Sequence, residues 1–560
     1  MRRRPVHEDP AAMDDALAAF ERVCRAFTEP RFYPHPVTAV QRIDTHISAV
    51  FLTGQWVYKL KKPVDFGFLD FTDLEARCRF CHREVALNRR FSRGVYEKVV
   101  EVRRGHSGIL SLDGPGELME CAVLMKQLPA DRSLQALVAS GALEEAQCRA
   151  LGERLAAFYA QAERNEEIRR FGTLTVIRRN VLENFEQTEP FVESVLDAEK
   201  WHLVRNVNEA FMEAHKDLFD RRLGDERICD GHGDLRSEHV YFLDDGLQII
   251  DAIEFNDRFR FGDAAADLAF LHMDLDARGA FPQSLIVLDA YVRGARDPSF
   301  YRVVDFYACY RAMVRVKVSC LRLQELNEEK GKGPNGEESG RCRSQAAQYL
   351  ELAYTYAVTM TRPTLYVFCG LPASGKSYHA ERLAQAFRMA LFQSDAVRRE
   401  VFPESFKAVP EKSAYGARLY RKERRRLVYS HLLNQAHEEL KERRSVVLDA
   451  TFAEKKWREE ALRLARDHDA AFIIVECRCS RDTLEKRLAA RDGHLTLSDA
   501  RLQHLPHFLK EYEPLDEPFP AESHTVCHTE GDPEDIFYRL LASLYAMQCS
   551  QARSRLEQSR

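Results

Sequence analysis

The stretch Gly370–Ser377, which reads GLPASGKS, constrains the fold of this chain more strongly than any other part of its sequence. It matches the pattern GxxxxGK[ST] at every fixed position, and it lies between an apolar run, TLYVFC, and a helix-like segment. In such a loop the glycines allow backbone N–H groups to turn toward a phosphate, and the positive end of the helix supports its charge. The sequence therefore predicts a strand, a phosphate-binding loop and a helix, in that order, around residue 370.

The same loop carries the side chains that a nucleoside triphosphate site requires. Lys376 is expected to reach the β- and γ-phosphates, and the hydroxyl of Ser377 is expected to ligate Mg²⁺. Gly370, Ser374 and Gly375 complete the expected phosphate cradle. We therefore expect ATP and Mg²⁺ as the cofactors of this part of the chain.

Two carboxylates follow at the ends of apolar runs, where ligand sites in parallel sheets lie. Asp449 ends SVVLD and is expected to hold Mg²⁺ through water. Asp395 ends MALFQSD and is expected to position an acceptor hydroxyl or take its proton, with a plain helix N-cap as the alternative. Arg398, one turn further on, is a candidate for holding an anionic substrate. The pattern thus predicts one metal-binding and one catalytic carboxylate.

Two groups of basic residues follow in the C-terminal part. Arg487 and Arg491 lie four residues apart in TLEKRLAARDG, on one face of an expected helix. They are candidates for closing over the transferring phosphoryl group as a lid, and solvated surface arginines are the alternative. The run RKERRR (421–426) lies in a helical stretch that alternates with Glu and apolar residues, so we interpret it as a solvated face, with a role in binding a substrate phosphate as the alternative.

Four short apolar runs alternate with amphipathic segments in this part of the chain: TLYVFCG, MALFQSD, SVVLDAT and AFIIVEC. Such alternation favours a parallel sheet covered by helices. A polar stretch rich in Gly and Glu (327–341) is expected to form an exposed loop, and a linker helix is expected over about 342–360. The α/β domain is therefore expected to begin at residue 362.

These features resemble the small-molecule and polynucleotide kinase branch of P-loop proteins, which includes gluconate kinase, polynucleotide 5′-kinase and zeta-toxin-like enzymes. The matching pieces are GLPASGKS, QSDAVRRE, LDATF with Arg458 downstream, and the arginine-bearing helix at 481–491. The resemblance covers roughly residues 362–546. It implies transfer of the ATP γ-phosphoryl group to a hydroxyl, with Asp395 near that hydroxyl and Arg458 among the substrate-binding residues.

A second candidate phosphotransfer motif, HGDLRSEH (232–239), lies earlier in the chain. The run LQIIDAIEF follows it and puts Asp251 at the end of an apolar strand. Phosphoryl transfer in the protein-kinase style needs two such acids: Asp234 would orient or deprotonate the acceptor hydroxyl, and Asp251 would hold Mg²⁺ on the nucleotide. The motif therefore predicts a second nucleotide site.

The spacing of this motif resembles the aminoglycoside phosphotransferase and choline kinase group, whose loop reads HGDLxxxN. The resemblance implies that Lys59 binds the nucleotide phosphates, with Lys61 on the same strand face as a close rival, and that Glu84 pairs with this lysine. It also implies that Asp263 and Asp267 are the structural acids that follow the metal strand.

One departure from that group affects the expected metal site. His239 stands where the second metal ligand is usually Asn, and imidazole suits Mg²⁺ less well than oxygen ligands do. The stretch FLTGQW offers only Gly54 in place of a glycine-rich loop over the phosphates. A kinase-like domain without turnover is therefore the alternative for this part of the chain.

Coarse patterns outline the rest of the N-terminal part. Two β-rich runs around Thr53-Gly54 predict a hairpin within 47–63, and helical spacing follows over 73–91. A strand is expected at 119–129, and residues 131–225 are mostly helical in pattern. Strands return within 239–255, where Asp-Asp-Gly predicts a turn.

The two motifs together resemble a bacterial family described as bifunctional aminoglycoside phosphotransferase/ATP-binding proteins, whose N-terminal signature is similar to the stretch from RIDTHISAV to EVALNRR. The resemblance implies an α+β protein-kinase-like (phosphotransferase) domain followed by an α/β P-loop kinase domain with a parallel sheet. The family label reports similarity of fold and does not fix the substrate. The expected parts are an N-terminal extension (1–34), the phosphotransferase-like domain (35–327), a loop and linker helix (328–361), the P-loop kinase domain (362–548) and a flexible tail (549–560).

The composition, 45% hydrophobic and 30% charged residues, is typical of a soluble globular protein, and the length predicts about three or four domains. The formal charge of −5 gives no general attraction to nucleic acid or anionic membranes. No apolar segment follows the basic N-terminus, and no apolar run approaches the ~20 residues that span a bilayer. Cys78 and Cys81 form a lone CxxC beside His82, which we interpret as buried or idle thiols in a reducing cytoplasm.

The leading hypothesis is a cytoplasmic ATP-dependent phosphotransferase with two nucleotide-binding domains. We expect the C-terminal domain to transfer the γ-phosphoryl group to a small-molecule hydroxyl acceptor, and we expect neither membrane nor nucleic-acid partners. One alternative is a nucleotide sensor in which the N-terminal domain lacks turnover. Another is a kinase of nucleic-acid ends, against which the acidic net charge argues because such binding neutralises many phosphates.

Overall fold

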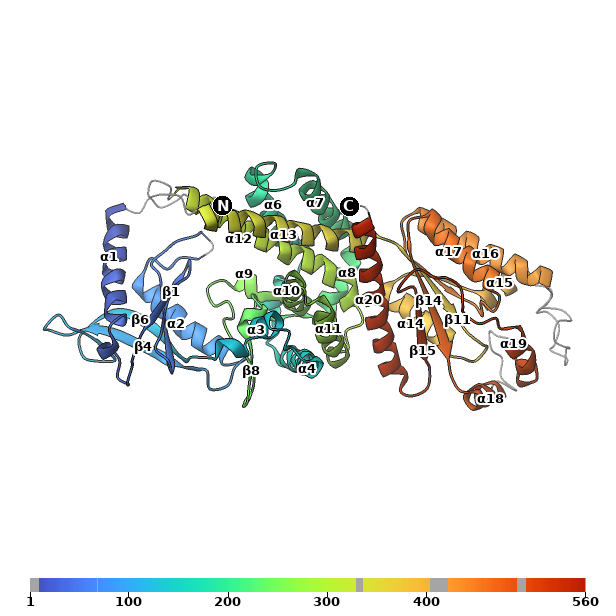
Figure 1. Cartoon of the computed structure of the whole chain (residues 1–560), viewed down its shortest axis with the longest axis horizontal. Helices are drawn as coiled ribbons and strands as arrows, with labels where there is room; N and C mark the ends of the chain where they lie inside the picture. Colours follow the sequence, from blue (N-terminus) through green and yellow to red (C-terminus); the bar gives the residue numbers. More distant parts are fainter. Residues whose placement is uncertain (1–9, 68, 329–335, 403–421, 491–499, 559–560) are drawn as a thin grey trace. The chain divides into compact units, whose positions relative to one another are not determined.

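The computed structural model describes residues 10–67, 69–328, 336–402, 422–490 and 500–558. The chain divides into two compact units, each built around a sheet (Figure 1). The first unit contains residues 1–179 and 215–287, and the second contains residues 180–214 and 288–560. The helices α6 (Leu174–Thr188) and α11 (Phe281–Ala295) begin in the first unit and end in the second.

The first unit opens with a six-stranded antiparallel sheet in the order β1-β2-β3-β6-β4-β5. Its central hairpin, β2 and β3, turns at Gly54, so the predicted hairpin is confirmed. The strands are β1 (Gln41–Asp44), β2 (Ser48–Leu52), β3 (Trp56–Lys61), β4 (Tyr96–Arg104), β5 (Leu110–Leu112) and β6 (Glu117–Lys126).

Two helices cover this sheet, and the period of two along β3 decides which side chain faces which helix. Tyr58 and Leu60 join the apolar cluster under α1 (Pro10–Phe27). Val57 joins the cluster under α2 (Leu74–Asn88), which the Asp73 side chain caps. Because Lys59 and Lys61 alternate with Tyr58 and Leu60, both lysines point toward α2.

The remainder of the first unit is mainly helical, as expected. Two short antiparallel pairs, β7 with β10 and β8 with β9, position the loops of the second motif. The strands are β7 (Ile228–Asp230), β8 (Val240–Leu243), β9 (Gly246–Ile249) and β10 (Phe261–Asp263). The helices are α3 (Leu134–Ala139), α4 (Glu145–Gln161), α5 (Glu166–Arg170), α8 (Lys216–Gly224), α9 (Asp257–Arg260) and α10 (Ala264–Ala277).

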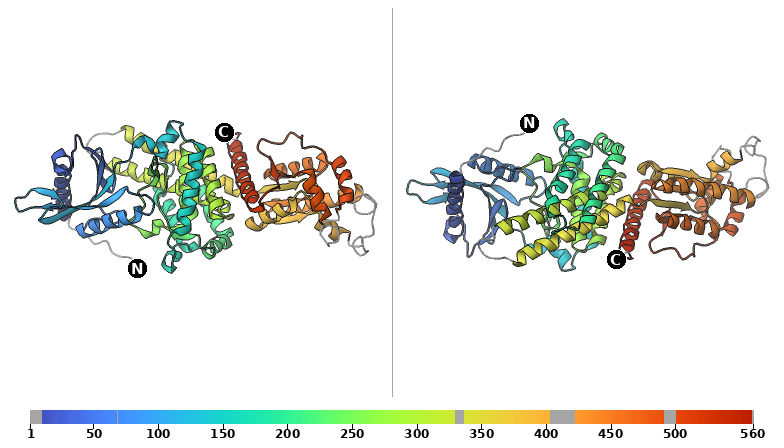
Figure 2. Two further views of the ribbon diagram at one scale, coloured as in Figure 1. Left: turned by 90° about the horizontal axis from the view of Figure 1, so that it is seen from below. Right: turned by 90° about the horizontal axis from the view of Figure 1, so that it is seen from above.

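The second unit contains a five-stranded, fully parallel sheet in the order β12-β13-β11-β14-β15. Figures 1 and 2 show this sheet in yellow to red with helices packed around it. Four of its strands correspond to the four predicted apolar runs. The fifth, HTVCH, was missed because its polar residues suit an edge strand and give little apolar signal. The strands are β11 (Thr364–Cys369), β12 (Ala390–Gln393), β13 (Val446–Asp449), β14 (Ala471–Arg478) and β15 (His524–His528).

Helices pack around this sheet, and the predicted fold classes of both parts are confirmed. A cluster of buried side chains from β11, β13, β14, α16 and α17 forms the core on one side. The helices that follow β11 in the chain are α14 (Lys376–Phe387), α15 (Ser394–Val401), α16 (Lys422–Lys441), α17 (Lys455–Asp467), α18 (Arg481–Ala489), α19 (Leu505–Glu511) and α20 (Pro533–Gln558). The same unit includes α7 (Ala198–Ala214), α12 (Val304–Glu328) and α13 (Gly336–Thr361).

Three segments differ from the expected loops and ends. Residues 549–558 are not a flexible tail but the last turns of α20, where Cys549 and Ala552 are buried and Gln551 bonds to Phe472. The helix expected from residue 342 already begins at Gly336, and residues 329–335 of the expected loop lie outside the described part. The expected N-terminal extension contributes α1 to the core of the first unit. The division into independently folding domains stays a prediction.

The cysteine interpretation needs one correction. Cys78 is not an idle thiol, because its sulfur is bonded to that of Cys121 and so links α2 to β6. Cys81 is a buried thiol, as expected, and twelve cysteines in all are free thiols. The CxxC pattern gave no sign of this pairing, because the partner lies 43 residues away. None of the described helices combines the length and the apolarity needed to cross a membrane.

Candidate functional site

The phosphate-binding loop follows β11 directly, and its backbone explains its glycines. Gly370 and Gly375 have φ values of 135° and 91°, in the region that favours glycine. A Cβ on Gly370 would lie 2.5 Å from the carbonyl oxygen of Cys477, so no larger residue fits there. Lys376 is the first residue of α14. The loop therefore has the strand–loop–helix geometry that the sequence predicted.

Asp449 lies at the end of β13, between the ends of β11 and β12. Its Oδ2 accepts a hydrogen bond of 3.1 Å from Nε2 of Gln393. Burial raises the pKa of the Asp449 carboxyl, while Lys376 and Ser377 oppose that rise. Its Oδ1 is buried without a hydrogen-bond partner among the described residues. A buried oxygen of this kind next to a serine hydroxyl fits Mg²⁺, which prefers oxygen ligands.

A pocket of about 430 Å³ opens on the α14 side of the loop. Arg487 lines it and donates hydrogen bonds to the backbone oxygens of Ala373 (3.2 Å) and Thr529 (2.7 Å). Burial lowers the pKa of His379, another lining residue, to about 4. Arg487 thus braces the loop at the edge of the pocket, and Arg491 lies outside the described residues.

A second pocket lies on the other side of Lys376, next to α15. Asp395 lines it from the first turn of α15, where Gln393 and not Asp395 occupies the N-cap position. Oδ1 of Asp395 accepts a hydrogen bond of 2.8 Å from Arg398. The structure therefore brings Lys376, Asp395 and Arg398 to one pocket, in agreement with the arrangement that the sequence suggested.

Arg458 does not match the expectation that it binds substrate. Its side chain is fully buried and forms an ion pair of 2.5 Å with Glu517. It also donates hydrogen bonds to the backbone oxygens of Phe452, Glu513 and Pro514. A guanidinium so enclosed braces the 513–517 segment and has no surface for a substrate.

The first unit brings the two candidate lysines to one ion-pair network. Lys59 lies 3.0 Å from Oε1 of Glu84 and 2.6 Å from Oδ1 of Asp251. Lys61 lies 2.7 Å from Oε2 of Glu84 and also bonds to Glu254. The side chains of Lys59 and Asp251 are 15% and 41% exposed, whereas that of Lys61 is 1% exposed. Only Lys59 is therefore placed to meet a ligand at Asp251.

The charges of this network follow from its contacts. Burial disfavours the charge of Asp251, but Lys59 and His239 outweigh it and hold the pKa of Asp251 well below its usual range. The pKa of Lys59 is raised, because Asp251 and Glu84 outweigh its desolvation. Burial raises the pKa of Glu254. Asp251 also has a φ of 65°, a conformation that is costly for a non-glycine residue and is common at functional sites.

The HGDLRSEH loop is held by buried contacts. The Asp267 carboxylate accepts hydrogen bonds from the backbone N–H groups of His232 (2.7 Å) and Gly233 (3.0 Å). Arg222 pairs with Asp263, which caps α10. The two acids that the resemblance assigned to structure thus lie where they hold this part of the fold.

At the candidate catalytic residue of this loop, Asp234, an arginine already occupies the carboxylate. Both carboxylate oxygens of Asp234 accept hydrogen bonds of 2.8 Å from Arg236. Nδ1 of His239 donates a hydrogen bond of 2.8 Å to the backbone oxygen of Asp234, so Nε2 faces Oδ2 of Asp251 at 3.6 Å. His239 therefore lies beside the candidate metal carboxylate, as its position in the motif implied. Within the described ranges, no group of three or more His, Cys, Asp or Glu side chains is arranged to hold a metal ion.

Several residues at these sites carry no sequence signal of their own. Gln393, Arg236 and Glu254 each lie within a quoted motif, but nothing in the spacing distinguishes them from neighbouring polar residues. Arg425, in the basic run interpreted as a solvated face, instead lines the pocket at Asp395 and pairs with Glu454 and Glu511. Its partners lie far along the chain, so the run by itself could not show which of its arginines faces the pocket.

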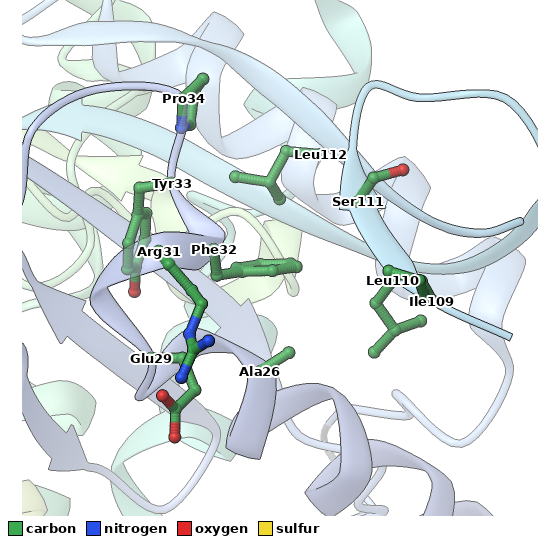
Figure 3. A pocket seen from close by; sticks show the side chains of 10 residues that line it. All are labelled: Ala26, Glu29, Arg31, Phe32, Tyr33, Pro34, Ile109, Leu110, Ser111 and Leu112. Atoms are coloured by element: carbon green, nitrogen blue, oxygen red, sulfur yellow. The ribbon is translucent and has the colours of Figure 1, made fainter.

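A further hollow, of about 730 Å³, lies in the first unit between the end of α1 and β5 (Figure 3). Most of its lining is apolar, and its charged side chains are Glu29 and Arg31. None of the residues that the sequence singled out lines it, so we assign it no chemical role. Its lining residues are Ala26, Glu29, Arg31, Phe32, Tyr33, Pro34, Ile109, Leu110, Ser111 and Leu112.

Comparison with known proteins supplies a family. The uncharacterized protein Rv2004c of Mycobacterium tuberculosis (strain ATCC 25618 / H37Rv) is 30% identical over 463 residues, which cover 82% of this chain and 88% of the mycobacterial protein. The chain belongs to the family of this protein. An alignment of this extent includes parts of both units. A family model described as AAA domain matches residues 365–515, and with the loop geometry this identifies a P-loop domain in the second unit.

Two solved structures are similar to parts of the chain. A gluconokinase from Sinorhizobium meliloti 1021 is 18% identical, with a TM-score of 0.26, and the match covers 35% of this chain and 98% of that one. A choline/ethanolamine kinase family protein from Mesorhizobium loti is 14% identical, with a TM-score of 0.34, and the match covers 61% and 99% of the two chains.

Proposed function

We propose that the chain is an ATP-dependent phosphotransferase whose P-loop domain transfers the γ-phosphoryl group of ATP to a hydroxyl of a small molecule. The observation that carries this proposal is the meeting of Lys376, Ser377, Asp449 and Asp395 beside the ends of three parallel strands. A cation, a hydroxyl and two carboxylates at that edge are what phosphoryl transfer to an alcohol requires.

Each side chain has a proposed task. The loop amides and Lys376 would hold the phosphates, and Ser377 and Asp449 would hold Mg²⁺, which would supply charge neutralisation when bound. Asp395 positions the acceptor hydroxyl and takes its proton as the new O–P bond forms and the bond from the γ-phosphorus to the bridging oxygen breaks. ADP then carries the leaving oxygen away. Arg487 steadies the loop during this exchange.

We propose a second nucleotide site around Lys59, Glu84 and Asp251, in line with the two-kinase family that the sequence resembles. Lys59 forms ion pairs with both Glu84 and Asp251. When a nucleotide binds, its ammonium could exchange the ion pair with Asp251 for one with a phosphate. Asp251 and His239 would hold the metal of this site. Arg236 occupies both oxygens of Asp234, which favours a regulatory site with little turnover as the second candidate function.

The proposed compartment is the cytoplasm, and the proposed partners are small hydroxylated molecules. Twelve free cysteines suit a reducing compartment, although the Cys78–Cys121 bond shows that one pair lies close enough to oxidise.

Calorimetric titration of the full chain with a non-hydrolysable ATP analogue and Mg²⁺ tests both sites. We expect two binding events, of which Lys376→Ala removes one and Asp251→Ala removes the other. Lys441→Ala, at an exposed position on α16, is the matched control and is expected to keep both. Binding that survives in Lys376→Ala at both sites contradicts the proposed P-loop function. If the parent shows a single binding event and Lys376→Ala removes it, the first unit has no nucleotide site and acts as a scaffold.

A further inference from the structure

We infer that the acceptor of the P-loop domain is a neutral polyhydroxylated molecule and not an anion; this inference rests on the proposed phosphotransferase function. The charged side chains that line the pocket at Asp395 are nearly balanced. Among the described residues they are three cations, Lys376, Arg398 and Arg425, and two carboxylates, Asp395 and Glu511. Because Lys376 belongs to the nucleotide phosphates, the described side chains that remain for the acceptor, two arginines and two carboxylates, carry no net charge.

The two arginines are already held by carboxylates. Nη1 of Arg398 donates to Oδ1 of Asp395 at 2.8 Å. Nη1 and Nη2 of Arg425 donate to Glu454 at 2.8 Å and to Glu511 at 2.9 Å. An anionic acceptor would have to compete with these carboxylates for the same donors, and it would meet their repulsion at close range. A neutral acceptor meets neither penalty.

The uncharged walls of the pocket suit a sugar or polyol. The aromatic side chains of Tyr429, Phe508 and Tyr512 line the pocket, and the C–H groups of such a molecule can pack against them. Ser394 and Thr451 offer hydroxyl groups, which act as both donors and acceptors. The ring of Tyr429 is fixed by stacking on Trp457, and its hydroxyl accepts a hydrogen bond of 2.9 Å from the backbone of Phe452. The pocket encloses about 50 Å³, which is less than a sugar occupies, so the acceptor has to widen it as it binds.

The bond between Arg398 and Asp395 also has a catalytic consequence. This hydrogen bond is made to Oδ1 of Asp395. We assign the contact with the acceptor hydroxyl to the other carboxylate oxygen, Oδ2. An acceptor that drew Arg398 away would release the carboxylate from this orientation. In this inference Arg398 is a positioning residue for Asp395, whereas the sequence suggested that it holds an anionic substrate.

The inference is tested by a steady-state assay of ADP release by the full chain with ATP and Mg²⁺. The assay compares three panels of candidate acceptors, matched in carbon number. The panels are neutral polyols and aldoses, their aldonate and phosphate-ester counterparts, and the corresponding amino sugars. We expect the best neutral compound to exceed the best charged compound in kcat/KM by roughly tenfold or more. A higher kcat/KM for a charged panel overturns the inference. It is also overturned if no compound stimulates ADP release while nucleotide still binds at the Lys376-dependent site. Loss of that nucleotide site instead overturns the proposed function.

A charge-neutralising variant provides an independent test. Glu511→Gln removes one carboxylate from Arg425, so the ratio of aldonate to polyol in kcat/KM is expected to rise by roughly fivefold to tenfold. Glu459→Gln makes the same change of net charge at an exposed position on α17, outside the pocket, and is expected to leave the ratio unchanged. An equal rise in both variants, or none in Glu511→Gln, contradicts the inferred role of the paired arginines.

Discussion

The ammonium of Lys59 lies 2.6 Å from Oδ1 of Asp251, although 192 residues separate the two along the chain. The same ammonium is 3.0 Å from Glu84. Lys61, two residues away on the same strand face, instead bonds to Glu84 and Glu254 in the interior. The two lysines therefore share one carboxylate and have different surroundings, which their variants should reveal.

Replacing each lysine by methionine should separate ligand binding from stability. Lys59→Met is expected to weaken nucleotide binding in the first unit by roughly 10- to 100-fold, through loss of a charge-assisted contact. Lys61→Met is expected to lower the free energy of unfolding by about 3–5 kcal/mol, since Glu254 would remain buried without its cation. Calorimetric titration and denaturant unfolding measure the two effects. If Lys61→Met loses nucleotide binding but keeps its free energy of unfolding, Lys61 and not Lys59 is the nucleotide lysine.

Arg458 should behave as a structural residue. Its removal in Arg458→Ala leaves the Glu517 carboxylate buried and unpaired, which is expected to cost about 3–5 kcal/mol. The double variant Arg458→Met, Glu517→Gln is expected to recover much of this loss, because neither charge is then buried alone. Denaturant unfolding of the parent and the two variants checks this. A variant with unchanged stability and a raised KM for the acceptor would restore the substrate-binding role.

Acid should destabilise the first unit through His232. Burial lowers the pKa of this imidazole from 6.5 to about 4. His232 therefore binds a proton near pH 6.5 in the unfolded chain but only near pH 4 in the folded chain. The free energy of unfolding consequently falls as the pH drops from about 6.5 to about 4. At pH 5 the loss is about 2 kcal/mol relative to neutral pH.

The variant His232→Gln tests this directly by unfolding at pH 7 and pH 5. Its pH-dependent loss is expected to be smaller than that of the parent by about 2 kcal/mol. His106→Gln, at an exposed position, is the control and is expected to keep the parental dependence. Equal pH dependence in all three proteins would show that His232 titrates normally.

Reduction should weaken the attachment of α2 to its sheet. The Cys78–Cys121 bond closes a loop with a sequence separation of 43, for which the loss of chain entropy corresponds to about 4 kcal/mol. Thermal melts with and without reductant are expected to show a lower Tm for the reduced protein, whereas Cys78→Ser should have the low Tm in both. Titration of the denatured, unreduced protein should find twelve thiols. Fourteen thiols and an unchanged melt would show that the bond does not form.

The sequence by itself determined the features that depend on neighbouring residues. GLPASGKS specifies its own backbone, because its glycines adopt φ values that side chains resist, and the apolar runs around it specify parallel strands. The same holds for the hairpin at Gly54. Asp395 and Asp449 could be predicted as site candidates because they end apolar runs, and strand ends in a parallel sheet share one edge.

The tertiary structure decided whatever depends on partners far away in the chain. Lys59 and Lys61 share a strand face, so only the position of Asp251 and Glu254 separates them. Arg458 became a brace because Glu517 lies against it, and Cys78 became half of a disulfide because β6 passes beside α2. A sequence pattern records spacing along the chain, whereas burial and ion pairing depend on which distant segments the folded core brings together.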